Sequence, residues 1–512
     1  MKKFNIIFLV AALLATSCTK DFEEINTNPN SPDKLTNVGL LLPNVIRSSV
    51  NSSFYNSYAR GDVAANLLAS DYASNFSNWA RSDASSYFLW SYYDYIRDLN
   101  EIIRISEEQG LNNYKGVALV LRSWMFQCLT DMYGPIPFRE ASLAKLDEIY
   151  SPKYEEQEDV YTGILADLEE ANSILGSSGE TIIGDILYSG SLAKWKMFAN
   201  GLSLRVLLRE SGKKDVSAQM KAITEHSDTH PLFASNADQA ALQYQDDRQE
   251  NNSPFYNSGN GATGTKLTKQ LVDTLKVLND TRLFVYALPT PVSSAPVNGV
   301  YPDPSEFEYE GDLNGIGAFP NANLTSPMGL LWMSKQYDPN LASTTAAQGI
   351  ILSYSEVQFI LAEAAEKGYI SGGSSAAETY YLNGIKDQFV YYASRIPGSY
   401  AGTYLKLSPS SIYANDAYFE QGGVAYEGTT DEKLDKIWLQ KWISLYLVGY
   451  EAWFEWRRTG FPNIPIGPIG PGYVPRRALY PADETRINID NYNQAVQWLG
   501  TDELSTRVWW DK

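Results

Sequence analysis

The sequence predicts a mostly α-helical protein made of tetratricopeptide-like helical pairs. Apolar residues recur at intervals of three and four along several long stretches, which is the spacing of one buried helix face. Several of these stretches end at glycine, or at glycine followed by proline, as helices commonly do. The stretches also come in pairs, and a two-helix repeat buries its apolar face against the next repeat.

The chain opens with a short leader that is typical of exported lipoproteins. Two lysines precede the apolar run Ile6–Leu14, which is shorter than the ~20 residues that a membrane-spanning helix needs. We expect residues 1–17 to be a lipoprotein signal peptide, Cys18 to be acylated, and residues 18–35 to form a flexible tether. The alternative is an ordinary secretory peptide with a chance cysteine. The usual lipoprotein motif has leucine three residues before the cysteine, whereas this chain has Ala15 there and Leu14 one place earlier.

The first two helical pairs are predicted near residues 90–133 and 158–210. The first pair has clear ends, because glycine follows one helix and Gly134-Pro135 follows the other. The four helices are expected at Trp90–Glu108, Tyr114–Tyr133, Glu158–Leu175 and Leu192–Glu210.

The third and fourth pairs are predicted near residues 355–393 and 431–458. Asp431 can cap the start of the last stretch, and Gly449 is a point at which that stretch can divide into two helices. Its tryptophans fall on one helical stripe, which favours core packing over ligand binding. The helices of the third pair are expected at Ser355–Gly368 and Ala376–Ala393. The tryptophans of the last stretch are Trp438, Trp442, Trp453 and Trp456.

Between the pairs lie long segments rich in Gly, Pro, Asn and Ser. Residues 231–350 contain one predicted helix, Lys266–Leu278, and residues 395–430 are similar in composition. Long loops in a compact protein commonly carry function, so the ligand site is expected there. No low-complexity linker divides the chain, and residues 36–512 are expected to form a single body.

Composition excludes several classes of function. The 512-residue chain has a formal net charge of −19, which argues against nucleic acid or anionic lipid headgroups as partners. Cys128 is the only cysteine of the body, so no internal disulfide framework can form, and its apolar helical surroundings predict a buried thiol. The two histidines, His226 and His230, lack the further ligands of a metal site, so neither metal nor cofactor is expected.

Several distinctive sequence runs together cover nearly the whole mature chain. In order, they are Ile25–Pro32, Asp131–Ala141, Leu352–Ala364, Tyr380–Ile385, Gln440–Trp442, Glu451–Trp453, Glu455–Pro462, Val474–Arg477 and Tyr480–Pro481, followed by Glu484 and Asn488. Taken together and in this order, these runs resemble the SusD/RagB family of outer-membrane glycan-binding lipoproteins, in particular its second SusD-like subgroup.

The resemblance implies four tetratricopeptide-like helical pairs that support a loop-rich region with a few short strands. It implies an oligosaccharide ligand, no catalysis, and a SusC-like TonB-dependent transporter over which the lipoprotein closes as a lid. The acidic residues Asp21, Glu23 and Glu24 resemble surface-export signals of such lipoproteins. We therefore expect a lipid-anchored protein of the outer membrane that faces the cell exterior and takes part in polysaccharide utilisation.

The chemistry of sugar recognition indicates candidate glycan-binding residues. Aromatic rings stack on the C–H faces of sugars, and planar polar side chains read the hydroxyl groups. The best candidates are aromatic residues in polar, loop-like surroundings, with their polar neighbours. They are Tyr72, Phe76, Asn78, Trp79, Arg81, Phe255, Tyr256, Tyr301, Tyr309 and Trp332.

Two other functions stay open from the sequence alone. A surface glycoside hydrolase needs only two carboxylates, which sixty acidic residues could supply. A helical-repeat scaffold that binds peptide or protein rather than glycan is the second alternative.

Overall fold

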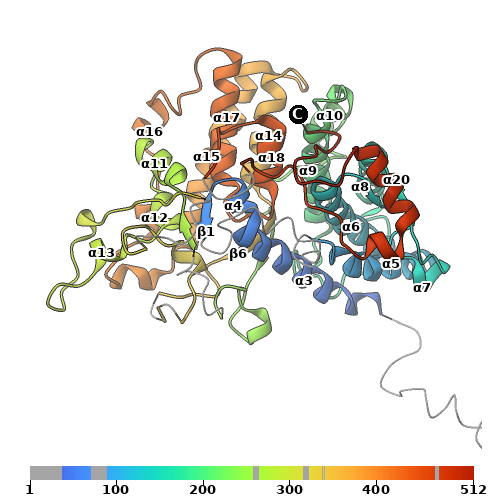
Figure 1. The fold of residues 1–512 in the computed structure, drawn as a ribbon, viewed down its shortest axis with the longest axis horizontal. Coiled ribbons are helices and arrows are strands. Elements are labelled where there is room, and N and C mark those ends of the chain that lie inside the picture. Colours follow the sequence, from blue (N-terminus) through green and yellow to red (C-terminus); the bar gives the residue numbers. More distant parts are fainter. Residues whose placement is uncertain are drawn as a thin grey trace, which may run out of the picture.

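The computed structural model describes residues 37–70, 89–257, 265–314, 322–336, 338–339, 341–467 and 472–511. Figure 1 shows helices along one side and through the middle of the molecule, and loops with short helices on the other side. The prediction of a mostly α-helical fold with a few short strands is confirmed. The leader, Cys18 and the tether lie outside the described residues.

The long helices lie close to the predicted ranges and pack in sequence. Consecutive long helices pack on each other within the first, second and third pairs, and α6 also packs on α8. They are α5 Tyr92–Gln109, α6 Asn112–Tyr133, α8 Gln157–Ile174, α9 Leu192–Glu210, α14 Tyr354–Glu366, α15 Gly373–Arg395, α17 Thr430–Ser444 and α18 Glu451–Thr459.

The last stretch divides near Gly449, as predicted. Helix α17 ends at Ser444, and Leu447 and Gly449 both adopt a positive φ before α18 begins. The expectation that Asp431 caps α17 is wrong. The cap is Thr429, whose side chain accepts from the backbone N–H of Glu432 while the Glu432 carboxylate accepts from the backbone N–H of Thr429, which completes a capping box.

A helix that the sequence reading did not identify, α3 Leu42–Asn56, precedes the first pair. It leads into the turns η2 Ser57–Gly61 and α4 Asp62–Ala64. The remaining helical segments are mostly short and lie mainly in the loop-rich parts. They are η1 Val38–Leu40, α7 Ala144–Asp147, α10 Ser217–Thr224, η5 Gln249–Asn251, α11 Lys269–Val277, α12 Leu283–Tyr286, α13 Pro291–Ser294, η6 Pro304–Glu306, η7 Leu330–Trp332, η8 Gly398–Gly402, η9 Pro409–Ser411, α16 Asp416–Glu420, α19 Glu484–Ile487 and α20 Ile489–Leu499.

The described strands form three two-stranded antiparallel sheets. Two of these sheets join strands that are more than 100 residues apart in the chain, and the third joins two nearby strands. The predicted helix at Lys266–Leu278 starts too early, because residues 265–267 form a strand and Thr268 caps α11. The pairs are β1 Leu68–Ser70 with β5 Thr265–Leu267, β2 Ile136–Pro137 with β3 Tyr154–Glu155, and β4 Ala240–Gln243 with β6 Gln348–Leu352.

Buried ion pairs join the second, third and fourth helical pairs. Arg205 of α9 lies 2.7 Å from Glu356 of α14, and Arg209 of α9 lies 2.5 Å from Glu451 of α18. A further link joins Arg458 of α18 to the carboxylate of α14 residue Glu363, at 2.6 Å. Because an isolated buried charge is very costly, these partners fix how the helices sit against one another.

The C-terminal segment packs back onto α6. The indole of Trp510 donates to Asp131 near the end of α6 at 2.8 Å, and the backbone N–H of Ala478 donates to the carbonyl of Met132 at 3.1 Å. Just beyond the helix, the Tyr480 hydroxyl donates to the carbonyl of Pro135 at 2.6 Å. The first pair is therefore completed by residues more than 300 positions later in the chain.

The body carries the buried thiol that the sequence predicts at Cys128. Among the described residues, no helix is both long and apolar enough to cross a membrane. Within the same ranges, no three His, Cys, Asp or Glu side chains are grouped so that they could hold a metal ion.

Candidate functional site

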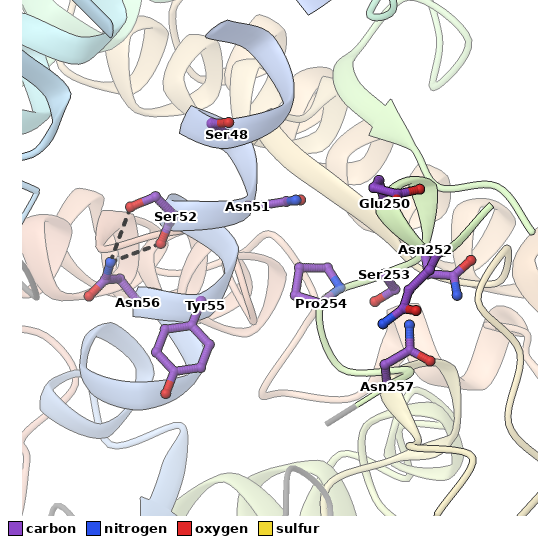
Figure 2. A pocket seen from close by; sticks show the side chains of 11 residues that line it. Ser48, Asn51, Ser52, Tyr55, Asn56, Glu250, Asn252, Ser253, Pro254 and Asn257 are labelled. Carbon is purple, nitrogen blue, oxygen red and sulfur yellow. Dashed lines mark hydrogen bonds between the residues drawn. The ribbon is translucent and has the colours of Figure 1, made fainter. Parts of the chain in front are cut away.

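A cavity of about 570 Å³ lies between helix α3 and the loop of residues 249–257; we call it the α3 cavity. Figure 2 shows its two walls, with Asn51 and Tyr55 on the helix and Ser253, Pro254 and Asn257 on the facing loop. The lining residues are Ser48, Asn51, Ser52, Tyr55, Asn56, Gln249, Glu250, Asn252, Ser253, Pro254 and Asn257.

Helix α3 presents a polar face to the cavity because its other face is apolar. Leu42, Val45, Ile46, Val50 and Phe54 recur at helical spacing and are all buried. This stripe packs into the core and turns the serines and asparagines of the opposite face outward.

The facing loop is fixed from behind. The backbone N–H of Ser253 donates to the Thr344 hydroxyl at 2.7 Å. The buried Phe255 ring packs edge-on against Phe54 and Tyr58, with centroids 4.9 and 5.0 Å apart. Contacts with the core thus hold the wall opposite α3 in place without a ligand in the cavity.

The cavity lining offers hydrogen-bonding groups that none of the described residues uses. The Ser253 hydroxyl is buried and has no hydrogen-bond partner among the residues that the structure describes. The side chains of Asn252 and Asn257 make no hydrogen bond within the part of the chain that the structure describes. A buried polar group without a partner is costly, so a polar ligand that satisfies it gains affinity.

The chemistry of the lining is that of neutral polar recognition. Amide and hydroxyl side chains each combine a donor with an acceptor, as sugar hydroxyls require. Tyr55 adds an aromatic ring at the cavity edge and is 49% exposed. Of the described lining residues, Glu250 is the only carboxylate, whereas hydrolysis of a glycosidic bond commonly uses two.

Tyr301, a sequence candidate, lies on the surface in a stacked aromatic pair. Its ring is 49% exposed and stacks on Tyr404 with centroids 4.6 Å apart and an interplanar angle of 13°. Phe307 packs against the other ring of the pair at 6.2 Å. This platform of Tyr301 and Tyr404 is a second place at which a sugar face could stack.

The other described candidates are less accessible. Trp332 is 5% exposed and packs in a cluster with Tyr286 and Tyr446 at centroid distances of 6.3 and 5.2 Å. Phe255 is buried beneath the α3 cavity, so Trp332 and Phe255 are assigned to the core rather than to a binding surface.

Tyr309 is half-buried and packs on Phe284 at 5.5 Å. Tyr256 is also half-buried, beside the α3 cavity, with the ammonium of Lys335 5.3 Å from its ring centre. Neither side chain is among the residues that line the α3 cavity.

The remaining candidates lie outside the described residues. They are Cys18, Tyr72, Phe76, Asn78, Trp79 and Arg81.

The sequence reading did not identify the residues on α3. Tyr55 stands between Asn51-Ser52-Ser53 and Asn56-Ser57, the kind of aromatic-in-polar setting that selected Trp79. The same criterion applied to this run would have found it. No local pattern reveals that α3 faces a loop about 200 residues later.

Comparison with known proteins gives a consistent result. Residues 29–481 match the SusD-like family that is described as starch-binding and associating with the outer membrane. No curated protein sequence matches the chain.

Solved structures resemble the chain over almost its whole length. An outer-membrane protein from Bacteroides vulgatus that is associated with nutrient binding is 29% identical, with a TM-score of 0.74. A chitin-binding protein is 27% identical, and a SusD homologue from Bacteroides fragilis is 25% identical, both with TM-scores of 0.74. Each similarity covers 93% of this chain and 100% of the other.

Proposed function

From the premise that this chain belongs to the SusD-like family, whose members associate with the outer membrane, we propose that it captures oligosaccharides at the cell surface and does not cleave them. The observation that carries this proposal is the α3 cavity, with its neutral amides, the exposed ring of Tyr55 and the Ser253 hydroxyl, which no described residue contacts by a hydrogen bond. These groups suit a ligand rich in hydroxyls that also has a weakly apolar face.

The proposal includes the anchor and the partner that the family resemblance implies. An acylated Cys18 would hold the body at the outer membrane, on the exterior side. A SusC-like TonB-dependent transporter would receive the oligosaccharide, with this protein as its lid. Co-purification of the tagged protein with such a transporter tests the partnership, and its failure under mild detergent would contradict it.

Glycan binding is tested by affinity electrophoresis and calorimetry. The starch association of the family and the chitin-binding relative make maltoheptaose and chitohexaose the first probes. Tyr55→Ala should weaken binding about five- to thirtyfold, because losing one aromatic contact commonly costs about 1–2 kcal/mol. Tyr413→Ala is the matched control, since Tyr413 is 53% exposed and does not line the α3 cavity.

The same assay separates the candidate surfaces. Loss of binding in Tyr301→Ala would place the main contact on the platform of Tyr301 and Tyr404 instead. The role of Trp79 stays a prediction, and Trp79→Ala belongs in the same series. Unchanged binding in all three variants would contradict every surface proposed here.

The two alternative functions predict different outcomes. A glycoside hydrolase would release reducing ends from the bound polysaccharide. A protein-binding scaffold would bind no glycan across a broad panel, while still folding normally by circular dichroism. Either result would replace glycan capture as the function.

A further inference from the structure

We propose that Glu250 makes the α3 cavity select neutral or positively charged sugars over anionic ones. This inference rests on the proposed function and adds the chemical class of the ligand. The disfavoured anionic sugars are uronic acids and sulfated sugars, and the favoured ones are neutral and amino sugars.

The charge of the lining carries the inference. Glu250 is exposed, lines the cavity and takes part in no ion pair within the described ranges. The other lining residues that the structure describes are neutral. Asp246 and Asp247 are exposed as well, and Asp247 forms an ion pair with Arg248 at 3.7 Å.

The described cations nearest the lining lie outside it. Arg60 of η2 donates to the Asn56 amide oxygen at 3.5 Å, and Lys335 sits over the ring of Tyr256. Arg47 and Arg248 are chain neighbours of lining residues but are not among the residues that line the cavity. Glu250 is therefore the charged side chain of the described lining itself.

The ligand-facing function of this cavity has independent support. Ser253 is 3% exposed and lines the cavity, and its hydroxyl has no partner within the described part of the chain. A sugar that reaches Ser253 passes between α3 and the loop that carries Glu250. Two like charges about 6 Å apart in largely water-like surroundings, with an effective dielectric constant of about 40–80, change a binding constant roughly three- to tenfold.

The test compares glycans that differ only in charge. The full-length protein in detergent is applied to an array that carries neutral, amino, uronic and sulfated forms of several common backbones. On every backbone that is bound, the neutral or amino form should exceed the anionic form by at least about threefold. The difference should shrink in high salt, because salt screens exposed charges.

Variants then assign the preference to one residue. Glu250→Gln should reduce the ratio of neutral to anionic binding about threefold or more. Glu378→Gln is the matched control, because Glu378 is exposed on α15, outside the lining, and its loss changes the net charge by the same amount. The ratio should be the same in Glu378→Gln and in the unmodified protein.

Each outcome decides one question. Equal or stronger binding of anionic forms would overturn the charge selection while leaving glycan capture intact. A ratio that moves equally in both variants would show a general charge effect and would remove Glu250 from this role. Binding of no glycan on any backbone would overturn the proposed function, and the inference would fall with it.

Discussion

At Glu363, burial and nearby cations act on one carboxylate in opposite directions. Burial alone would raise its pKa, but Arg458, Lys367 and Lys441 together lower the pKa to about 2. Arg458 contributes two hydrogen bonds, at 2.6 and 2.7 Å. A carboxylate whose pKa is lower in the folded state stabilises the fold above its unfolded pKa.

The predicted pH dependence follows from this sign. The stability that Glu363 contributes should be complete above about pH 4.5 and should be lost as pH falls toward about 2, by about 3 kcal/mol. Glu363→Gln should lose this amount at pH 7 and should show a flatter decline between pH 5 and 2. Urea midpoints at each pH measure both effects.

Glu378→Gln is the control for this series, since its carboxylate is exposed on α15. An equally steep acid decline in Glu363→Gln would show that other carboxylates govern acid unfolding.

The site candidates show what sequence can indicate for a single side chain. The polar surroundings of Tyr301 correctly predicted an exposed ring. The same reasoning wrongly predicted an exposed ring at Trp332. Tyr286, Tyr392 and Tyr446 pack around that ring, and they come from three separate parts of the chain. Local polarity therefore indicates exposure only where no remote element covers the residue.

Among the elements, the third helical pair depends on a glycine at its contact. A Cβ atom on Gly384 of α15 would lie 2.8 Å from the Phe359 ring of α14. Gly384→Ala should therefore destabilise the protein by about 1–3 kcal/mol, although alanine alone favours a helix by about 1 kcal/mol. Thermal unfolding measures the net effect.

Two further variants make that prediction specific. Glu378→Ala changes an exposed residue of the same helix and should not lower the melting temperature. Phe359→Leu should partly restore the stability of Gly384→Ala by making room. A melting temperature that rises in Gly384→Ala would mean that the two helices adjust without cost.

The helices were predictable to different degrees. The long pairs have apolar stripes and clear ends, so their ranges follow from the sequence. Helix α3 carries the same spacing at Leu42, Val45, Ile46 and Val50, but its many serines and asparagines are typical of loops. Its apolar face packs into the core, and this tertiary packing outweighs the low helix propensity.

At the scale of the whole molecule, one cysteine should decide where the protein resides. Cys18→Ala should release the folded protein from the membrane fraction and abolish labelling with a radioactive fatty acid, because a lipid chain is the expected anchor. Cys128→Ala is the matched control, since this thiol is buried in the body and should leave anchoring unchanged.

Membrane retention and fatty-acid labelling of Cys18→Ala would contradict lipidation at this position. If Cys18→Ala releases the protein but leaves nutrient uptake unchanged, Cys18 is the anchor but anchoring is not needed for delivery of the nutrient.

The packing of residues 472–511 on α6 also sets an order of events during export. The first helical pair is synthesised early, whereas Tyr480 and Trp510, which hydrogen-bond at the end of α6 and just beyond it, follow more than 300 residues later. Contacts between such distant parts of a chain form slowly. The first pair therefore reaches its final packing only after residues 472–511 have been made, and a chain cut short before them would present the uncovered end of α6 to proteases.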